Sequence, residues 1–494
     1  MTAITMKFDR HATRLLLILA VLTGWRLLAA WHAGMELYAD EAQYWTWALN
    51  PDWGYYSKPP MVAWAIWLGT ALFGDGEQGV RAVSVLVYPL TAWLIFLLAR
   101  RLFQPAAEAG RIAFWAGLIY ATLPMVSLGA WLITTDAFLL LFWTLSLYVL
   151  TLALESGRWR DWLLLGVAIG LGLLSKYSMV FFGLGLAVYL ALSPERRRLF
   201  LDPRPYAAAL VALLVLLPNI LWNANHQFVS YQHTAEISQL DRALFHPDAL
   251  LAFFGGQFGV FGPFTFAALL LLAVRPKVWL ADDRLRLLAA FALAPLAAFL
   301  GLSLMSRAFA NWAAFSYVAA TLLVAAWWVR QDRRGWLVVS LALHLALAAG
   351  MYHLHDITRA VDIPLTRKTD PYGRVTGYRA LGAAVSDRLR ALPDARLLGD
   401  DRKLFALMRY YARPASGDGR MLNPDGAIDN HYDLTVDVRH SSSGTFLLVT
   451  ESASPEKLAT WFEEVTPQAP IRLDLYPDYK PEYQVWRVRN YRAP

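Results

Sequence analysis

Long runs of uncharged residues are the feature that most constrains this chain. About 18 or more consecutive apolar residues are needed to cross the hydrocarbon core of a bilayer as a helix. Stretches of that length without Asp, Glu, Lys, Arg or His occur at 82–99, 112–135, 137–154, 249–274, 287–306 and 308–329. Of the 494 residues, 57% are hydrophobic and only 17% are charged, which few soluble chains of this size show. The sequence therefore predicts a polytopic membrane protein.

Weaker apolar segments add to this count. They lie at 15–35, 162–175, 177–193, 206–223 and 336–351, where Arg26 interrupts the first and His344 the last. Together the segments predict an all-α membrane domain of about eleven transmembrane helices over residues 1–351. No small-residue cleavage site follows the first segment, so we expect a retained anchor and not a removed signal peptide.

The basic residues predict the orientation of these helices. If the spans alternate, one side holds the N-terminus and the basic segments 100–111, 158–160, 196–204, 275–286 and 330–334. The loops on the other side carry only Lys58, Arg81, Lys176, Arg242 and Arg307. Because cytoplasmic loops are enriched in Lys and Arg, the N-terminus is predicted to be cytoplasmic and the first loop and C-terminal domain periplasmic. The net charge of +7 then reflects these loops and does not indicate nucleic-acid binding.

Residues 352–494 have the composition of a soluble domain. Leu381, Val385, Leu389 and Leu392 lie on one face of a predicted helix that ends at Pro393. Short apolar runs predict strands at 396–399, 445–450 and 483–488, and a second helix near 455–462. We expect a small α/β extracytoplasmic domain.

The first loop, residues 36–80, contains the sequence YADEAQYWTW at 38–47. Its many Trp and Tyr residues suit the headgroup level of a membrane, and two short interfacial helices are predicted, the second starting at Pro59 and Pro60. Asp40 has two explanations. It is either the N-cap of the first helix or a general base that accepts a proton from an attacking hydroxyl. Spacing alone does not decide between them.

Several stretches resemble one known family. DEAQYW at 40–45, followed by YYSKPPMVAW at 55–64, resembles the first external loop of the GT-C type polyprenyl-phosphate-sugar glycosyltransferases, which include the protein O-mannosyltransferases and the lipid A aminoarabinose transferase. Further similar stretches follow in the expected order: TTDAFLLLFW at 134–143, GLLSKYSMVF at 172–181, PNILWNANHQFVSYQH at 218–233, FGGQFGVFGPF at 254–264 and ANWAAFSYVA at 310–319. The resemblance covers about residues 10–350. It implies a GT-C fold in a bacterial cytoplasmic (inner) membrane.

The resemblance also implies roles for individual residues. Asp40 would be the catalytic base and Glu41 its companion, while Lys58 would stabilise the charge that grows on the departing phosphate. Lys58 has an alternative role as an interfacial lysine that binds any anionic lipid. Lys176 and Arg307 are further candidate phosphate contacts, although Lys176 is also placed to complement a helix C-terminus.

The remaining candidate residues are polar groups near the outer ends of spans. Asp136 is either a helix N-cap or a second acidic group facing the substrate, and Tyr56 is expected to contact substrate. Asn223, His226 and His233 lie in a long loop, and their side chains suit sugar hydroxyls, although an ordering role for the loop is an equal alternative. Gln257 and Asn311 are typical of hydrogen bonding between helices.

No metal site and no cofactor are predicted. The two histidines seven residues apart are a weak metal signal, and Ser57 stands where the aminoarabinose transferase has a glutamate. That departure also weakens the transfer of its sugar specificity to this chain. The chain has no cysteine, so disulfides and thiolate ligands are excluded.

The resulting hypothesis is an integral-membrane glycosyltransferase. It would move a sugar from an undecaprenyl-phosphate-type donor to a lipid A, other glycolipid, polysaccharide or protein acceptor on the periplasmic face, with inversion at the anomeric carbon. Membrane lipids would be its other partners. Two alternatives stay open: a transporter or flippase of lipid-linked sugar, and a polysaccharide polymerase whose substrates are both carrier-linked. The chain shows neither the paired halves nor the broken helices at matching positions that an inverted-repeat transporter predicts.

Overall fold

The computed structural model describes residues 9–239, 245–441 and 443–492 and divides into two compact units. The helical unit comprises the chain up to Ala29 together with Lys58–Val62 and Arg81–His353. The mixed unit comprises Ala30–Ser57, Ala63–Val80 and the chain from Leu354 onward. The first loop had been grouped by hydropathy with the membrane region. Most of it instead packs with the C-terminal domain, because helix α2 (Ala39–Ala48) lies against helix α20 (Arg402–Tyr411).

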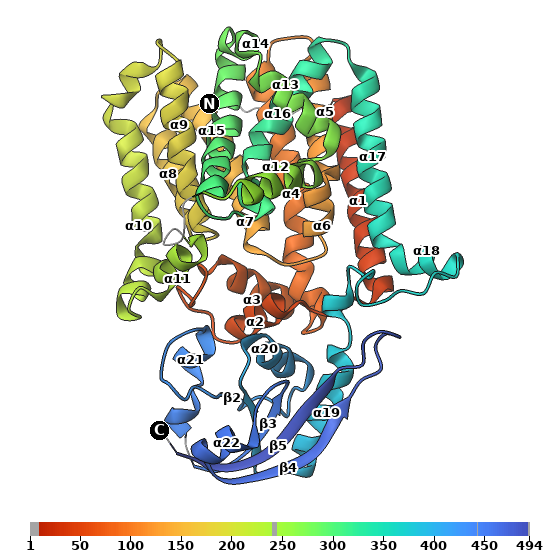
Figure 1. Ribbon diagram of the computed structural model, residues 1–494. Helices are drawn as coiled ribbons and strands as arrows, with labels where there is room; N and C mark the ends of the chain where they lie inside the picture. Colours follow the sequence, from red (N-terminus) through yellow and green to blue (C-terminus); the bar gives the residue numbers. More distant parts are fainter. Residues whose placement is uncertain (1–8, 240–244, 442, 493–494) are drawn as a thin grey trace. The chain divides into compact units, whose positions relative to one another are not determined.

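The helical unit is built almost entirely of α-helices (Figure 1). Its elements are α1 (Arg10–Ala33), α4 (Glu77–Phe103), α5 (Ala109–Thr122), α6 (Pro124–Gly129), α7 (Thr135–Ser156), α8 (Trp159–Leu173), η1 (Tyr177–Val180), α9 (Phe181–Leu192), η2 (Arg197–Phe200), α10 (Pro203–Asn225), α11 (Val229–Ser238), α12 (Pro247–Phe261), α13 (Pro263–Ala273), α14 (Pro276–Leu280), α15 (Asp283–Met305), η3 (Ala310–Ala313), α16 (Ser316–Arg330) and α17 (Arg334–Tyr352). The ends of α1 and α4 continue into the mixed unit.

All eleven predicted spans are helical, but the count of eleven transmembrane helices is not confirmed. Among the described residues, six helices are long and apolar enough to cross a membrane: α1, α4, α7, α10, α15 and α17. The predicted span 249–274 is the pair α12 and α13, bent by 118°, which would make a seventh. The bend falls at Gly262, whose φ of +88° favours glycine, and Pro263 then starts the next helix.

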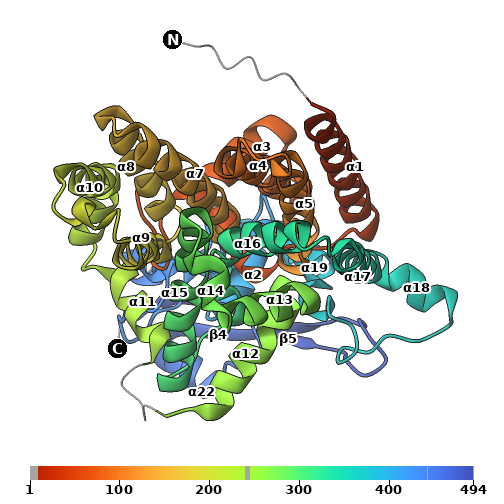
Figure 2. The same ribbon diagram turned by 90° about the horizontal axis from the view of Figure 1, so that it is seen from above.

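Burial within the helical unit separates central from peripheral helices. The short helix α16 is central, packs against α5 and α15, and buries nearly all of its residues. Figure 2 shows α16 in the middle of the unit, with α10 at one side and α1 and α17 at another. In α1, α10 and α17, only about a third or less of the most apolar 18-residue stretch of the helix is buried. Their exposed apolar faces suit contact with lipid.

The mixed unit combines the two loop helices with a five-stranded sheet. Its elements are α2, α3 (Met61–Phe73), α18 (Leu354–Ala360), η4 (Gly373–Val375), α19 (Tyr378–Ala391), β1 (Ala395–Gly399), α20, β2 (Arg420–Met421), α21 (His431–Thr435), η5 (Val438–Ser441), β3 (Thr445–Thr450), α22 (Pro455–Trp461), β4 (Phe462–Arg472) and β5 (Glu482–Tyr491). The strand order is β2-β1-β3-β5-β4. β1 pairs in parallel with β2 and β3, whereas β5 pairs antiparallel with β3 and β4.

The sheet confirms the predicted α/β character of the C-terminal domain. The three predicted strands correspond to β1, β3 and β5, and the two predicted helices to α19 and α22. Inward-facing residues of these strands, including Leu398, Phe446, Leu448 and Val488, form the core. α20, α21, β2 and β4 were not predicted.

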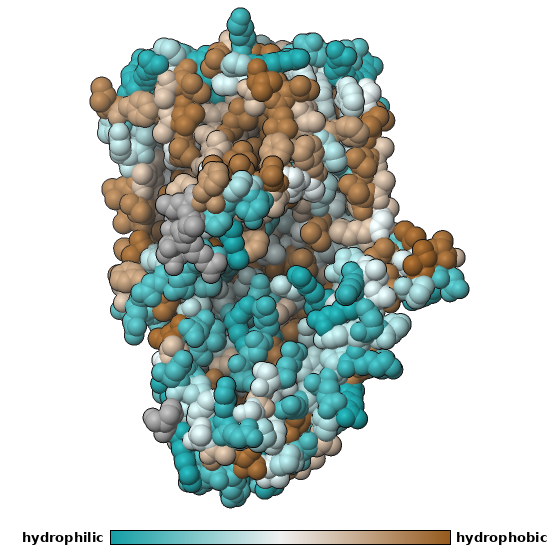
Figure 3. Space-filling model, viewed as in Figure 1, coloured by the Kyte–Doolittle hydropathy of each residue, from teal (hydrophilic) through white to brown (hydrophobic). Residues whose placement is uncertain are grey.

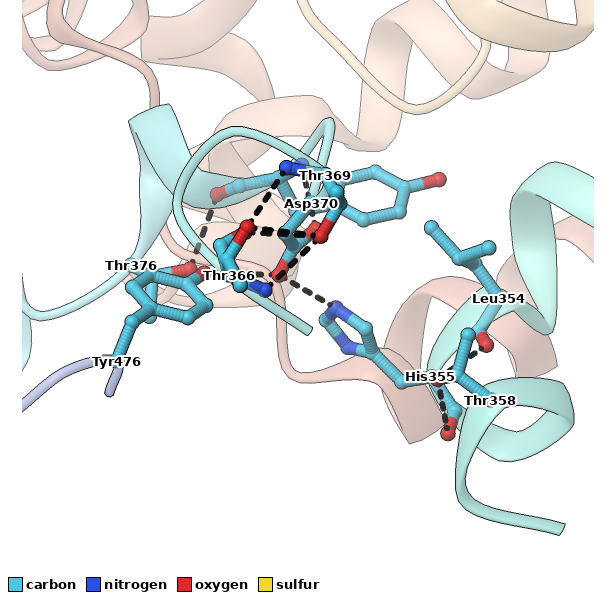
Figure 4. Close-up of polar contacts among 9 residues, drawn as sticks. Leu354, His355, Thr358, Thr366, Thr369, Asp370, Thr376 and Tyr476 are labelled. Atoms are coloured by element: carbon cyan, nitrogen blue, oxygen red, sulfur yellow. Dashed lines mark hydrogen bonds and ion pairs between the residues drawn. The ribbon is translucent and has the colours of Figure 1, made fainter. Parts of the chain in front are cut away.

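A buried carboxylate anchors the segment that leads from α17 into this domain (Figure 4). Asp370 Oδ2 accepts hydrogen bonds from the Tyr476 hydroxyl at 2.8 Å and from His355 Nε2 at 3.0 Å, and Asp370 Oδ1 accepts one from the Tyr372 amide. Ile357 and Val361, in and just after α18, are exposed. Figure 3 shows this segment as a brown, apolar part of an otherwise polar domain surface.

Candidate functional site

The two adjacent carboxylates of the first loop have different surroundings. Helix α2 begins at Ala39, so Tyr38 is the N-cap and Asp40 is not. Glu41 is 2% exposed, and its Oε2 accepts a hydrogen bond from the Tyr38 amide at 3.0 Å. Tyr38 thus holds the N-cap position considered for Asp40, and Glu41, the third helical residue, binds the Tyr38 amide as in a capping box. The companion role of Glu41 stays a prediction.

Asp40 presents its carboxylate at the surface of the mixed unit. Its side chain is 43% exposed. Oδ1 lies 3.0 Å from Nη1 of Arg402, the first residue of α20. The same Nη1 hydrogen-bonds Oε1 of Gln43, one turn along α2. Oδ2 is left without a hydrogen-bond partner in the part of the chain that the structure describes.

The two aspartates that precede Arg402 fix the backbone at the start of α20. Asp401 is the N-cap of α20 and accepts hydrogen bonds from the amides of Lys403 and Leu404. Asp400 is bound by the Thr450 hydroxyl at 2.5 Å, and burial raises the pKa of its carboxyl. In the sequence DDR, Asp400 is a half-buried carboxylate bound to Thr450, Asp401 caps α20, and the guanidinium of Arg402 reaches the first loop.

The NHYD sequence at 430–433 also packs against the first loop. The Tyr432 hydroxyl lies 3.1 Å from the Thr46 hydroxyl, and burial raises the pKa of Tyr432 to about 12. The His431 ring packs edge-on against Trp47 and Tyr55, at centroid distances of 5.4 and 5.3 Å. These contacts fix the orientation of α2, and so of Asp40.

The helical unit has a second polar cluster, formed by Asp136, Lys176 and Asn311. Lys176 Nζ donates to Asp136 Oδ1 at 2.6 Å, and Asn311 Nδ2 donates to Asp136 Oδ2 at 2.9 Å. Asp136 lies in the first turn of α7, Lys176 precedes η1, and Asn311 lies in η3. The ion pair is partly shielded, since the two side chains are 18% and 19% exposed.

Lys58 belongs to a segment that is hydrogen-bonded to the segment of Lys176 within the helical unit. The Met61 amide donates to the Leu174 carbonyl at 3.1 Å, which joins the SKPP segment to the turn after α8. Lys58 is three residues before Met61, and Lys176 is two residues after Leu174. The fold therefore brings these two lysines, predicted from separate stretches, to the same end of the helical unit.

The other predicted residues have varied positions. Arg307 is exposed and its guanidinium lies 4.8 Å from the Phe309 ring centre. Tyr56 is buried. His226 stacks on Trp222 and hydrogen-bonds its carbonyl at 2.7 Å, and His233 is half-buried in α11. Arg242 lies outside the described residues.

Asn223 has a structural role. It is fully buried, its Oδ1 accepts from the Ser230 amide, and its Nδ2 donates to the Asn219 carbonyl. These bonds join the end of α10 to the start of α11, as the loop-ordering alternative predicts. The sugar contact stays a prediction.

Sequence reasoning missed two residues at these clusters. The sequence indicates no role for Arg402, and it indicates for Asn311 only a hydrogen bond between helices. The partners of both lie far away in the sequence, because Asp40 and Arg402 are 362 positions apart and Asp136 and Asn311 are 175 positions apart. As for metals, the described residues contain no group of three or more His, Asp or Glu side chains able to hold an ion.

Comparison with known proteins supports one family. Residues 57–222 match the family described as dolichyl-phosphate-mannose-protein mannosyltransferase. The lipid A galacturonosyltransferase RgtD of Rhizobium johnstonii is 31% identical over 460 residues, which cover 90% of this chain and 94% of that protein. The undecaprenyl phosphate-α-4-amino-4-deoxy-L-arabinose arabinosyl transferase of Pseudomonas paraeruginosa is 36% identical over 171 residues, covering 33% of this chain and 30% of that enzyme.

A solved structure shows the same fold. The crystal structure of ArnT from Cupriavidus metallidurans bound to undecaprenyl phosphate has a TM-score of 0.63 at 17% identity, covering 96% of this chain and 97% of that one. The match to RgtD along nearly its whole length decides between the transferase and transporter alternatives. The chain belongs to the GT-C fold glycosyltransferases, the multi-pass membrane enzymes that take their sugar from a polyprenyl phosphate.

Proposed function

We propose that this enzyme transfers a galacturonosyl group from a polyprenyl phosphate to lipid A. The observation that carries the proposal is the similarity to a lipid A galacturonosyltransferase over 90% of the chain. The aminoarabinose enzymes are similar over only a third of it. Ser57 stands where the resemblance places a glutamate of the aminoarabinose transferase, which weakens the transfer of that enzyme's sugar specificity to this chain.

Asp40 acts as the general base in this proposal. Its open Oδ2 accepts the proton of a lipid A hydroxyl as that oxygen attacks the anomeric carbon of the donor sugar. The bond between this carbon and the phosphate oxygen breaks, and its electron pair leaves with the polyprenyl phosphate. The attack from the opposite side inverts the anomeric centre.

Lys58 and Lys176 stabilise the departing phosphate. Negative charge grows on the phosphate oxygens as the sugar leaves, so an ammonium group held near them stabilises the transition state more than the ground state. The bond from Met61 to Leu174 supports a shared role, because it joins the segments that carry the two lysines. The exposed Arg307 is a further candidate contact.

The proposed location is the outer face of the bacterial cytoplasmic membrane. The excess of Lys and Arg on one set of loops supports a cytoplasmic N-terminus, with the first loop and the C-terminal domain in the periplasm. The polyprenyl tail of the donor and the acyl chains of lipid A both keep the substrates at that surface.

The test is transfer in liposomes. Wild type, Asp40→Asn and the control Asp52→Asn, an exposed carboxylate of the same loop, are reconstituted with lipid A and radiolabelled polyprenyl phosphate carrying galacturonic acid, aminoarabinose or a neutral hexose. We expect label from galacturonic acid to enter lipid A with wild type and Asp52→Asn, and not with a folded Asp40→Asn. Transfer of another sugar would correct the substrate. Label that crosses the bilayer equally in all three proteins, without transfer, would overturn the proposal.

A further inference from the structure

Among the described residues, Arg402 makes the one hydrogen-bonded ion pair with the side chain of Asp40. Its Nη1 lies 3.0 Å from Oδ1 and also hydrogen-bonds Gln43, so one guanidinium binds two side chains on the same face of α2. Gln43 is 1% exposed, and the cap by Asp401 fixes the backbone from which Arg402 extends. Both partners of this contact belong to the mixed unit.

We propose that Arg402 is a positioning residue, through which the C-terminal domain takes part in catalysis. The inference rests on the proposed role of Asp40. By holding Oδ1, Arg402 leaves Oδ2 without a hydrogen bond to the described residues, so that it can accept the proton of an acceptor hydroxyl. A base oriented by a third group is the arrangement that efficient proton abstraction needs. Arg402 itself takes no proton.

A purely structural role for this pair fits the surroundings less well. Both side chains are accessible, at 31% for Arg402 and 43% for Asp40, and exposed ion pairs contribute little to stability. Other polar contacts already join the loop segments of the mixed unit to the C-terminal domain. They include Arg379 with Glu77 at 2.7 Å, Leu37 with Tyr411 at 2.6 Å and Thr46 with Tyr432 at 3.1 Å.

The Arg379–Glu77 pair provides the matched control. Like Arg402, Arg379 lies in the C-terminal domain and binds a carboxylate from the N-terminal part of the chain, but it does not contact Asp40. Arg402→Gln should lower kcat by about 100-fold, the order expected when a reacting group is displaced by about 1 Å, with little change in the KM for donor. Arg379→Gln should leave kcat within a few-fold of wild type. Melting temperatures show that each variant is folded.

Rescue of the lost activity distinguishes a positioning role of Arg402 from a role in packing alone. Arg402→Lys should recover part of the lost kcat, and low, non-denaturing guanidinium should partly rescue Arg402→Ala but not Asp40→Asn. An unchanged kcat in Arg402→Gln, an equal loss in Arg379→Gln, or a failure of both rescues would overturn the inference. Its failure is distinguishable from failure of the base assignment: an inactive Asp40→Asn with a fully active Arg402→Gln rejects only the role of Arg402, whereas an active Asp40→Asn rejects the base itself.

Discussion

Lys176 allows a test of the proposal that it stabilises the departing phosphate. If Lys176 instead serves only the ion pair with Asp136, a double variant should behave differently. Lys176 Nζ lies 2.6 Å from Asp136 Oδ1, and both side chains are less than one-fifth exposed. Lys176→Met leaves Asp136 with Asn311 alone, and Asp136→Asn leaves the ammonium without its counter-charge. Each single variant should lose about 1.5–3 kcal/mol in free energy of unfolding, the usual contribution of a hydrogen bond to a charged group.

The double variant Lys176→Met/Asp136→Asn contains neither charge. Its stability should return to within about 1 kcal/mol of wild type, because no unpaired charge remains. Its activity should stay low, since loss of one donor to a developing oxyanion costs about 10²–10³-fold in kcat. Transfer of radiolabelled sugar in liposomes gives kcat, and thermal unfolding in detergent gives the stability. Lys176→Met and the double variant should be equally slow, and Asp136→Asn alone should be faster than both.

The control is Lys480→Met, which removes a second Lys–Asp pair. Lys480 Nζ lies 3.1 Å from Asp474 Oδ2, and both side chains are more than 60% exposed, so neither activity nor stability should change measurably. If the activity of the double variant recovers together with its stability, Lys176 serves only the ion pair. That result would refute the phosphate role.

Three further predictions concern other groups. Glu41→Gln should retain most of the activity, in contrast to Asp40→Asn, and Glu41→Ala should cost about 1 kcal/mol of stability, because Glu41 caps α2 at the Tyr38 amide. Burial raises the pKa of Asp433 to about 6, so the folded state favours the protonated carboxyl. The stability that this carboxyl contributes is present below about pH 4 and is lost as the pH rises through 6. The melting temperature of wild type relative to Asp433→Asn should therefore fall between pH 4.5 and pH 7, and a rise would contradict this reasoning. Activity should survive dialysis against EDTA, because Ser57 replaces a potential metal ligand and the described residues gather no metal-binding group; loss of activity that is restored by a divalent cation would contradict it.

Hydropathy predicted the helical segments well, since the bilayer leaves a chain few ways to satisfy its backbone. It predicted helix boundaries less well, because an apolar run does not show where a helix bends. The run 249–274 contains the signal that was overlooked, a Gly-Pro pair at 262–263, which marks a break between helices. The run 112–135 is likewise divided, by Pro124 at the start of α6.

The contact between Asp40 and Arg402 could not be predicted from the sequence. Arg402 and Asp40 are 362 positions apart, and no periodicity or spacing rule relates residues at that separation. The DDR sequence comes directly after β1, at the end of the predicted strand 396–399. Its contact with Asp40 depends on the packing of α20 against α2, which the sequence does not show.

The assignment of the two first-loop carboxylates depends on where α2 begins. With Tyr38 as the N-cap, Glu41 occupies the third helical position, from which a carboxylate reaches back to the cap amide. Had the helix begun two residues later, Asp40 would have been the cap, and both its oxygens would have been directed at backbone amides. The observed start instead leaves Asp40 on the outer face of the first turn, where Arg402 binds one oxygen and the other stays open to substrate. A difference of two residues in the helix start thus decides which of the two carboxylates is buried against the cap amide and which is exposed, and composition around the DEAQYW sequence does not determine it.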